Sequence, residues 1–235
     1  METRNGIDWE RIENFVGFGR FDAPVVFVGI EEGLASEEHL SSDLTRRSGF
    51  EPTMDLRKAH EGIADTDKWF GPSKIKCQRT WRPMCDLMLR RGGTLSPTLQ
   101  TRNEYQALRL GRSNGDTLLM ELLPYPHKKN TRWLYARFGR YPTREAYERA
   151  MVPKRKELIR NALAQAKREI VVCYGKDHWP QFMPLFAGAV WQDRSPFQST
   201  SIGGTRVVLA PHFRRKEFNT DQQLASFGGI ALAAK

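Results

Sequence analysis

The sequence predicts an α/β fold, a three-layer α/β/α sandwich whose central sheet has four mainly parallel strands. The first observation is a set of four short apolar runs, rich in β-branched residues, that each end abruptly in polar, Gly or Pro residues. Such runs are typical of strands buried on both faces of a parallel sheet. The second observation is that segments with helical spacing separate the later runs. With the residues that end them, the four runs span 26–33, 118–124, 170–175 and 207–212.

Local signals set the elements of the first half of the chain. The polar connection after the first strand is long, and a connection of more than ~15 residues is usually functional or contains small helices of its own. Gly92-Gly93 stops a helix, and Asn114-Gly115 is an effective turn pair before the second strand. The expected elements are a helix at 9–15, a strand at 25–28, a polar connection at 31–73, a helix at 82–91 and a strand at 118–123.

Similar signals set the second half. Thr143 can cap one helix, and Pro153 is expected to start another, because proline suits the first turn of a helix. A cap at Asn219 or Thr220 starts a helical tail. The expected elements are helices at 143–150 and 153–166, a strand at 170–175, a helix at 177–186, a strand at 207–211 and a final helix up to about 232.

The bulk properties indicate one intracellular domain over residues 1–235. The chain has no linker, no signal-peptide-like start and no apolar run near the ~20 residues that a membrane span needs. Cys77, Cys85 and Cys173 form no close CxxC pair, which argues against a disulfide framework, a zinc site or an iron–sulfur cluster. We therefore expect a cytoplasmic, nucleoid-associated monomer without metal or cofactor.

The charge indicates a polyanionic partner. Lysine and arginine number 37 against 27 acidic residues, for a net charge of +10, and nucleic acid is the usual partner of such a domain. Basic residues cluster between Lys128 and Arg168, where solvated helix faces explain most of them. For the run Arg214-Arg215-Lys216, beside a candidate catalytic histidine, phosphate contact is the better interpretation. We expect DNA as the partner.

The strand ends carry the residues that are suited to chemistry. Glu31 and Glu32 end the first strand, Glu121 lies at the end of the second, and His212 follows the fourth. Parallel α/β sheets place their ligands at these carboxyl ends. Each residue alone has a plain alternative, namely an exposed acidic turn, a solvent-facing glutamate or a structural histidine.

This order of motifs resembles the uracil-DNA glycosylase superfamily over residues 22–216. The resemblance implies a residue, third in the Gly-rich loop after the first strand, that positions or activates the water attacking the sugar C1′. Aligned on Gly29 and Gly33, this residue is Glu31, whose charge would also stabilise an oxocarbenium-like transition state. Most relatives have proline where this chain has Glu32. Either carboxylate could therefore face the sugar, and we favour Glu31.

The resemblance also implies a role for His212. The superfamily's last motif begins with a histidine that donates a hydrogen bond to the base O2 as charge builds on the leaving base. The family's usual Pro-Ser-Pro loop is replaced here by Phe213-Arg214-Arg215. An aromatic ring and two arginines would fill the gap left by an extruded base and bind flanking phosphates. The expected DNA-binding residues are Phe213, Arg214, Arg215, Lys216, Lys128, Lys129, Asn130 and Arg132.

Glu121 stands where the uracil-acting families have asparagine, which reads the uracil edge. An ionised glutamate cannot donate a hydrogen bond, but it accepts one from a cytosine-type N4 amine. If burial keeps Glu121 protonated, it can also donate to N3. The pocket is therefore expected to be tuned away from plain uracil. Phe70 or Trp69 would stack on the flipped base, and Ile30 would line the same pocket.

The resemblance therefore predicts a monofunctional DNA glycosylase. It would flip out a pyrimidine foreign to ordinary DNA, either uracil or a modified cytosine or uracil, and hydrolyse its N-glycosidic bond to leave an abasic site. A phage-type modified base, such as hydroxymethylated or glycosylated cytosine, would imply phage defence rather than DNA repair. The alternatives are a non-catalytic nucleic-acid-binding protein of the same fold, and an N-glycoside hydrolase acting on free nucleosides or nucleotides.

Overall fold

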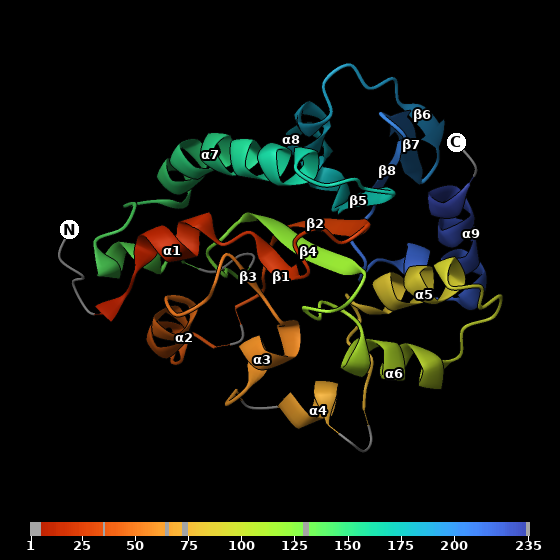
Figure 1. Ribbon diagram of the computed structural model, residues 1–235. Coiled ribbons are helices and arrows are strands. Elements are labelled where there is room, and N and C mark those ends of the chain that lie inside the picture. Colours follow the sequence, from red (N-terminus) through yellow and green to blue (C-terminus); the bar gives the residue numbers. More distant parts are fainter. Residues whose placement is uncertain (1–5, 35, 64–65, 72–74, 129–131, 234–235) are drawn as a thin grey trace.

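One mixed, mostly parallel sheet of eight strands organises the protein, with helices packed against it (Figure 1). The computed structural model describes residues 6–34, 36–63, 66–71, 75–128 and 132–233. The strand order is β3-β1-β4-β2-β5-β8-β7-β6. The strands are β1 (Gly17–Gly19), β2 (Val25–Glu31), β3 (Thr53–Met54), β4 (Thr117–Leu123), β5 (Ile170–Tyr174), β6 (Gln192–Arg194), β7 (Phe197–Ile202) and β8 (Thr205–Ala210).

The four expected strands form the centre of this sheet, in the order β4-β2-β5-β8, and all three pairings between them are parallel. This confirms the α/β class and the parallel centre, whereas the expected number of four strands is wrong. On one side, β1 pairs antiparallel with β4 and parallel with β3. On the other, the β6–β7 hairpin adds antiparallel to β8. These outer strands are short, glycine-containing or polar, so they lack the continuous apolar run of a buried strand.

The helices match the expectations in part. The helix expected at 82–91 forms with these bounds, the described part of the connection 31–73 contains three small helices, and Thr220 caps the last helix. The helix at 99–108 was not expected. The α-helices are α1 (Trp9–Asn14), α2 (Leu40–Arg47), α3 (Leu56–His60), α4 (Thr66–Phe70), α5 (Arg82–Arg91), α6 (Leu99–Leu108), α7 (Arg144–Ala164), α8 (Trp179–Phe182) and α9 (Asp221–Leu232).

Two expectations about helices are corrected. The predicted break before Pro153 is absent, because α7 runs through it as one helix of 21 residues. Its buried residues Tyr147, Met151, Arg155 and Ile159 recur every four positions across the proline, and the packing of this continuous face outweighs one lost backbone hydrogen bond. The helix expected at 177–186 is instead three short turns, interrupted by prolines.

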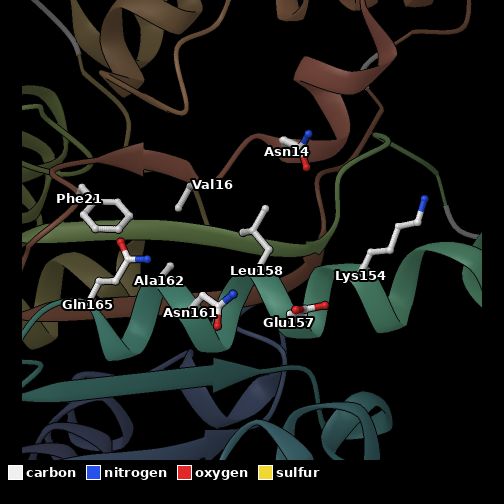
Figure 2. A pocket seen from close by; sticks show the side chains of 9 residues that line it. All are labelled: Asn14, Val16, Phe21, Lys154, Glu157, Leu158, Asn161, Ala162 and Gln165. Carbon is white, nitrogen blue, oxygen red and sulfur yellow. The ribbon is translucent and has the colours of Figure 1, made fainter.

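Alternate residues of each central strand face opposite layers. One face, which includes Phe27 and Val172, packs against α5 and α9. The other face, which includes Val28 and Val171, packs against α7 and α8. A shallow hollow of about 500 Å³ lies between the second half of α7 and the segment 14–21 (Figure 2). None of the expected site residues lines it. No helix in the described ranges is both long and apolar enough to cross a membrane.

A buried ion-pair group joins the helices on the first face. Asp86 of α5, with no exposed surface, accepts hydrogen bonds from Arg90 at 2.6 Å and from Nε of Arg102 at 2.9 Å. Arg102 belongs to α6, is 2% exposed, and also pairs with Asp221 of α9 at 2.8 Å. The three helices α5, α6 and α9 are therefore held together through the Arg102 guanidinium.

We predict that Asp86→Asn destabilises the protein by about 3–5 kcal/mol, because it leaves the buried Arg102 guanidinium without its main counter-charge. The midpoint of urea unfolding measures the effect. Glu169→Gln is the matched control, since Glu169 is half exposed in its pair with Arg91, and such pairs contribute about 0–1 kcal/mol. Equal losses in the two variants would contradict the prediction.

Candidate active site at the carboxyl edge of the parallel strands

The central strands bring the expected residues to one edge of the sheet. Gly29 of β2 is in register with Glu121 of β4, and the pairing of Val28 with Cys173 places Tyr174 of β5 on the other side of Gly29. From β2 the chain continues to β4, on one side of the sheet, and from β5 it continues to β8, on the opposite side. The switch point of the sheet therefore lies between β2 and β5. Ligands of open α/β sheets bind outside the strand ends at this point.

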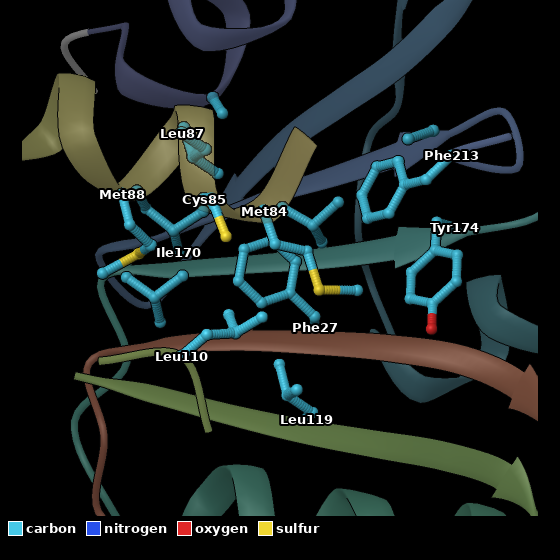
Figure 3. Packing of buried hydrophobic residues seen from close by; sticks show 14 of the residues in the cluster. Phe27, Met84, Cys85, Leu87, Met88, Leu110, Leu119, Ile170, Tyr174 and Phe213 are labelled. Carbon is cyan, nitrogen blue, oxygen red and sulfur yellow. The ribbon is translucent and has the colours of Figure 1, made fainter. Parts of the chain in front are cut away.

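Glu121 and Tyr174 reach toward each other across β2. The Tyr174 hydroxyl donates a hydrogen bond to Oε1 of Glu121 at 3.0 Å, and it points from β5 toward β2 (Figure 3). A Cβ at position 29 would overlap both Oε2 of Glu121 and this hydroxyl. The absence of a side chain at Gly29 is therefore what lets the two groups meet.

The Glu121 carboxyl lies in an environment that favours its neutral form. Burial raises its pKa well above the ordinary value, and the nearby carboxylates Glu32 and Glu31 add to the rise. The Tyr174 hydrogen bond and the Arg155 charge oppose the rise without cancelling it. Oε2 is buried and, among the described residues, has no hydrogen-bond partner. A protonated Glu121 therefore carries an unused donor at this atom.

Glu31, the expected water-activating residue, is held by an arginine from α7. Arg144 donates to its Oε2 at 2.6 Å and also pairs with Glu148. Burial raises the pKa of Glu31, although Arg144 opposes the rise. The carboxylate is thus fixed in direction at the start of α7.

Glu32 forms a bidentate ion pair. Arg47 of α2 donates to both of its carboxylate oxygens at 2.8 Å and also pairs with Asp43. Burial alone would raise the pKa of Glu32, but Arg47 outweighs burial and lowers it. The structure therefore distinguishes the two adjacent carboxylates, because Glu32 is tied in a bidentate pair, whereas Glu31 has one donor contact to Arg144.

His212 follows β8 and lies beside Tyr174. The backbone N–H of Arg214 donates to its Nδ1 at 3.2 Å, which leaves the proton of the neutral ring on Nε2. The Tyr174 ring lies edge-on to the imidazole, with centroids 5.9 Å apart. Tyr174 therefore contacts both Glu121 and His212.

The loop after His212 separates into a buried and an exposed part. Phe213 is 2% exposed and stacks on Tyr174 at 4.5 Å between ring centroids. It is a core residue, which corrects the expectation that it contacts DNA, because the packing of Tyr174, Phe218 and Phe227 encloses its ring. Arg214, Arg215 and Lys216 are exposed, as a phosphate-binding segment requires.

The expected pocket-lining residues do not gather on one face. Phe70 is 3% exposed in the core and lies against His60, with ring centroids 5.4 Å apart. Trp69 is partly buried beside the same core. Ile30 packs instead against the α7 side of the sheet. Ile30 therefore lies on the face opposite Glu121, which corrects its expected place beside the base edge.

The other expected DNA contacts lie after β4. Lys128 and Arg132 are exposed, and Arg132 forms an ion pair with Glu37 at 3.4 Å. Lys129 and Asn130 lie outside the described residues. In the described part of the chain, no group of three or more His, Cys, Asp or Glu side chains is placed to hold a metal ion.

Sequence reasoning missed the groups that surround the carboxylates. Tyr174 ends the third apolar run, and its position at a strand end was the available signal. Arg47 and Arg144 carried no signal, because each lies in a helix with other basic residues. His60 is half-buried, its pKa is lowered by desolvation, and it lies within electrostatic range of Glu32.

We predict that Gly29→Ala destabilises the protein by about 1–3 kcal/mol, the usual cost of overpacking, because the new Cβ displaces the Glu121 carboxyl and the Tyr174 hydroxyl. Gly33→Ala is the matched control from the same segment, since a Cβ there meets no atom within 4 Å. Thermal unfolding of both variants tests this. A tolerated Gly29→Ala would show that the two side chains do not depend on the missing Cβ.

We predict a pH-dependent effect of Glu121→Gln. Because the pKa of Glu121 is raised in the folded state, this state binds the proton more tightly than the unfolded chain does. Its contribution to the free energy of unfolding therefore falls as the pH rises above the ordinary value of 4.5. Glutamine does not titrate, so Glu121→Gln does not lose this contribution. The free energy of unfolding of the variant, relative to that of the native protein, should therefore increase from pH 5 to 8. Urea unfolding across this range measures the difference. The exposed Glu104→Gln should run parallel to the native protein, and a parallel Glu121→Gln curve would contradict the prediction.

Comparison with known proteins adds no assignment to this site. No protein-family model matches the chain, and the comparison with curated proteins gives no match. Any function proposed for it rests on its residues and their geometry.

Proposed function

We propose that this protein is a monofunctional DNA glycosylase that removes a pyrimidine foreign to ordinary DNA. The observation that carries the proposal is the meeting of Glu121, Tyr174 and His212 at the switch point of the parallel strands. This point is where an α/β sheet binds its ligand. The net charge of +10 adds a general affinity for a polyanion.

The proposed reaction uses Glu31 and His212 on opposite parts of the nucleotide. Glu31 takes a proton from the water that attacks the sugar C1′, a new C1′–O bond forms, and the N-glycosidic bond breaks. The carboxylate stabilises the positive charge that develops on the sugar. The base leaves with the electron pair of the broken bond, and Nε2–H of His212 donates to the base O2. Arg144 keeps Glu31 oriented throughout.

The proposed DNA contacts come from exposed basic residues near the same edge. Arg214, Arg215 and Lys216 follow His212 directly, and Lys128 and Arg132 follow β4. Contacts with phosphates position the duplex without reading its sequence. DNA binding should weaken steeply as salt rises, because each neutralised phosphate releases counterions.

The base proposed for this site is uracil or a modified cytosine or uracil. A neutral Glu121 offers a donor at Oε2 and an acceptor at Oε1, and a pyrimidine edge presents the complementary pair. Glu121 stands where the uracil-acting families have asparagine. This difference fits action on phage-type modified bases, and therefore a part in phage defence. A part in base-excision repair fits uracil itself.

One observation favours a second candidate, a nucleic-acid-binding protein without catalysis. Both strand-end carboxylates, Glu31 and Glu32, are held in ion pairs with arginines. Buried pairs of this kind stabilise charged groups that would otherwise be costly to bury. In this case the carboxylates serve the fold, and replacing Glu31 would leave the DNA affinity unchanged.

We predict that the protein releases a base from at least one of four duplexes, containing uracil, hydroxymethyluracil, hydroxymethylcytosine or glucosylated cytosine. Abasic-site cleavage followed by gel electrophoresis detects the product. Glu31→Gln and His212→Ala should each lower the rate about 10²–10⁴-fold, the usual contribution of a general acid or base, while DNA affinity stays near that of the native protein. The exposed Glu104→Gln is the control.

The outcomes separate the candidates. No product from any duplex, with unchanged DNA affinity in both variants, would leave the non-catalytic candidate. Hydrolysis of free nucleosides with no salt dependence and no action on DNA would indicate a nucleoside or nucleotide N-glycoside hydrolase instead.

A further inference from the structure

The bridge between Glu121 and Tyr174 restricts how the Glu121 carboxyl is presented. Oε1 accepts from the Tyr174 hydroxyl at 3.0 Å, and Oε2 lies buried over Gly29. The Tyr174 ring is itself fixed, because it stacks on Phe213 with an interplanar angle of 13°. The carboxyl therefore cannot turn freely, and its two oxygens have different roles.

The direction of the tyrosine hydrogen bond assigns the proton. Because the hydroxyl donates to Oε1, this oxygen acts as the carbonyl-type acceptor, and a proton held by Glu121 resides on Oε2. A carboxylic acid held in this way presents one donor beside one acceptor. An ionised carboxylate in the same place would present acceptors only.

The charges around Glu121 determine what such a group can bind. Glu32 and Glu31 face it from the end of β2, Arg155 from α7 and Tyr174 from β5. Both neighbouring glutamates are paired with arginines, and Arg155 donates to backbone carbonyls. An anionic ligand would meet three carboxyl groups, and a cation would compete with the arginines. A neutral, planar ligand is the one that fits.

We propose that Tyr174 is a positioning residue that holds Glu121 as an oriented carboxylic acid, and that this acid binds the neutral edge of a pyrimidine that offers a donor beside an acceptor. The inference rests on the proposed function for the identity of the ligand as a nucleobase. It adds that the protonated carboxyl of Glu121 recognises the donor–acceptor pair of the base edge. This pair is N4–H with N3 in cytosine and N3–H with O4 in uracil. Modification at C5 leaves both edges intact.

The test uses free bases as probes, so that it does not depend on catalysis. Cytosine and uracil are added to the protein, and binding is followed by ligand-observed saturation-transfer NMR. The protonation of Glu121 is followed in protein labelled with ¹³C at the glutamate carboxyl carbon, where Glu121→Gln identifies the signal by its loss. 1,3-Dimethyluracil, which lacks the N3 donor, is the control ligand.

We expect both bases to bind the native protein and dimethyluracil to bind far more weakly. Affinity should fall as the pH rises through the titration of Glu121, because the charged form loses its donor. Glu121→Gln should keep binding at every pH, since an amide always offers a donor and an acceptor. Tyr174→Phe should weaken binding about 3- to 10-fold, the effect of one hydrogen bond, and should move the Glu121 titration to higher pH. Tyr105→Phe, in α6, should change neither property.

The results that would overturn the inference are specific. They are equal binding of dimethyluracil, or a Tyr174→Phe variant with native base affinity and an unmoved Glu121 titration. If Tyr174 had a structural role alone, Tyr174→Phe would lower stability without moving the Glu121 titration, and Glu121→Gln would not retain base binding at every pH. Base binding with the expected pattern but no abasic product from any duplex would reject the glycosylase proposal and leave this inference standing.

Discussion

The absence of a side chain at Gly29 is the constraint on which the carboxyl edge of the sheet depends. Glu121 and Tyr174 belong to strands that are separated by β2, so their side chains can meet only by lying over the middle strand. Any Cβ at position 29 would occupy this space. The glycine is needed here for close approach rather than for an unusual backbone angle, since β2 continues through it as a regular strand.

The three carboxyl groups near this glycine avoid mutual repulsion in two different ways. Glu31 and Glu32 receive an arginine each, from α7 and α2. Among the described residues Glu121 has no such ion-pair partner, and burial favours its neutral form. This division follows from position, because Glu31 and Glu32 lie where helices can reach them, whereas Glu121 is enclosed between strands. A site with two arginine-paired carboxylates and one carboxyl whose neutral form is favoured by burial is the kind of arrangement that gives similar side chains different chemical roles.

The sequence predicted the parallel centre of the fold because each central strand is a continuous apolar run. It also predicted which strand ends carry Glu31, Glu121 and His212, since strand ends are visible in such runs. It could not predict β1, β3 or the β6–β7 hairpin, whose polar and glycine residues depend on pairing with a neighbour for their structure. Nor could it show that Phe213 is buried, because a single aromatic residue after a strand is equally compatible with a loop or a core. Arg47 and Arg144 lie 15 and 113 residues from their carboxylates, and no local pattern links residues so distant.

The continuity of α7 through Pro153 connects this fold to the site. Arg144 and Arg155 are eleven residues apart, which is close to three turns and about 16 Å along one face of a helix. At one end, Arg144 holds the Glu31 carboxylate. About three turns further along α7, the buried Arg155 donates to the backbone carbonyl of Glu121 at 2.7 Å and to those of Glu13 and Phe15. Burial lowers the pKa of this guanidinium to about 10, so it stays charged at neutral pH. Two helices that met at Pro153 would hold these arginines independently. One rigid helix instead fixes the end of β2 relative to the end of β4, and thereby the place of Glu31 relative to Glu121.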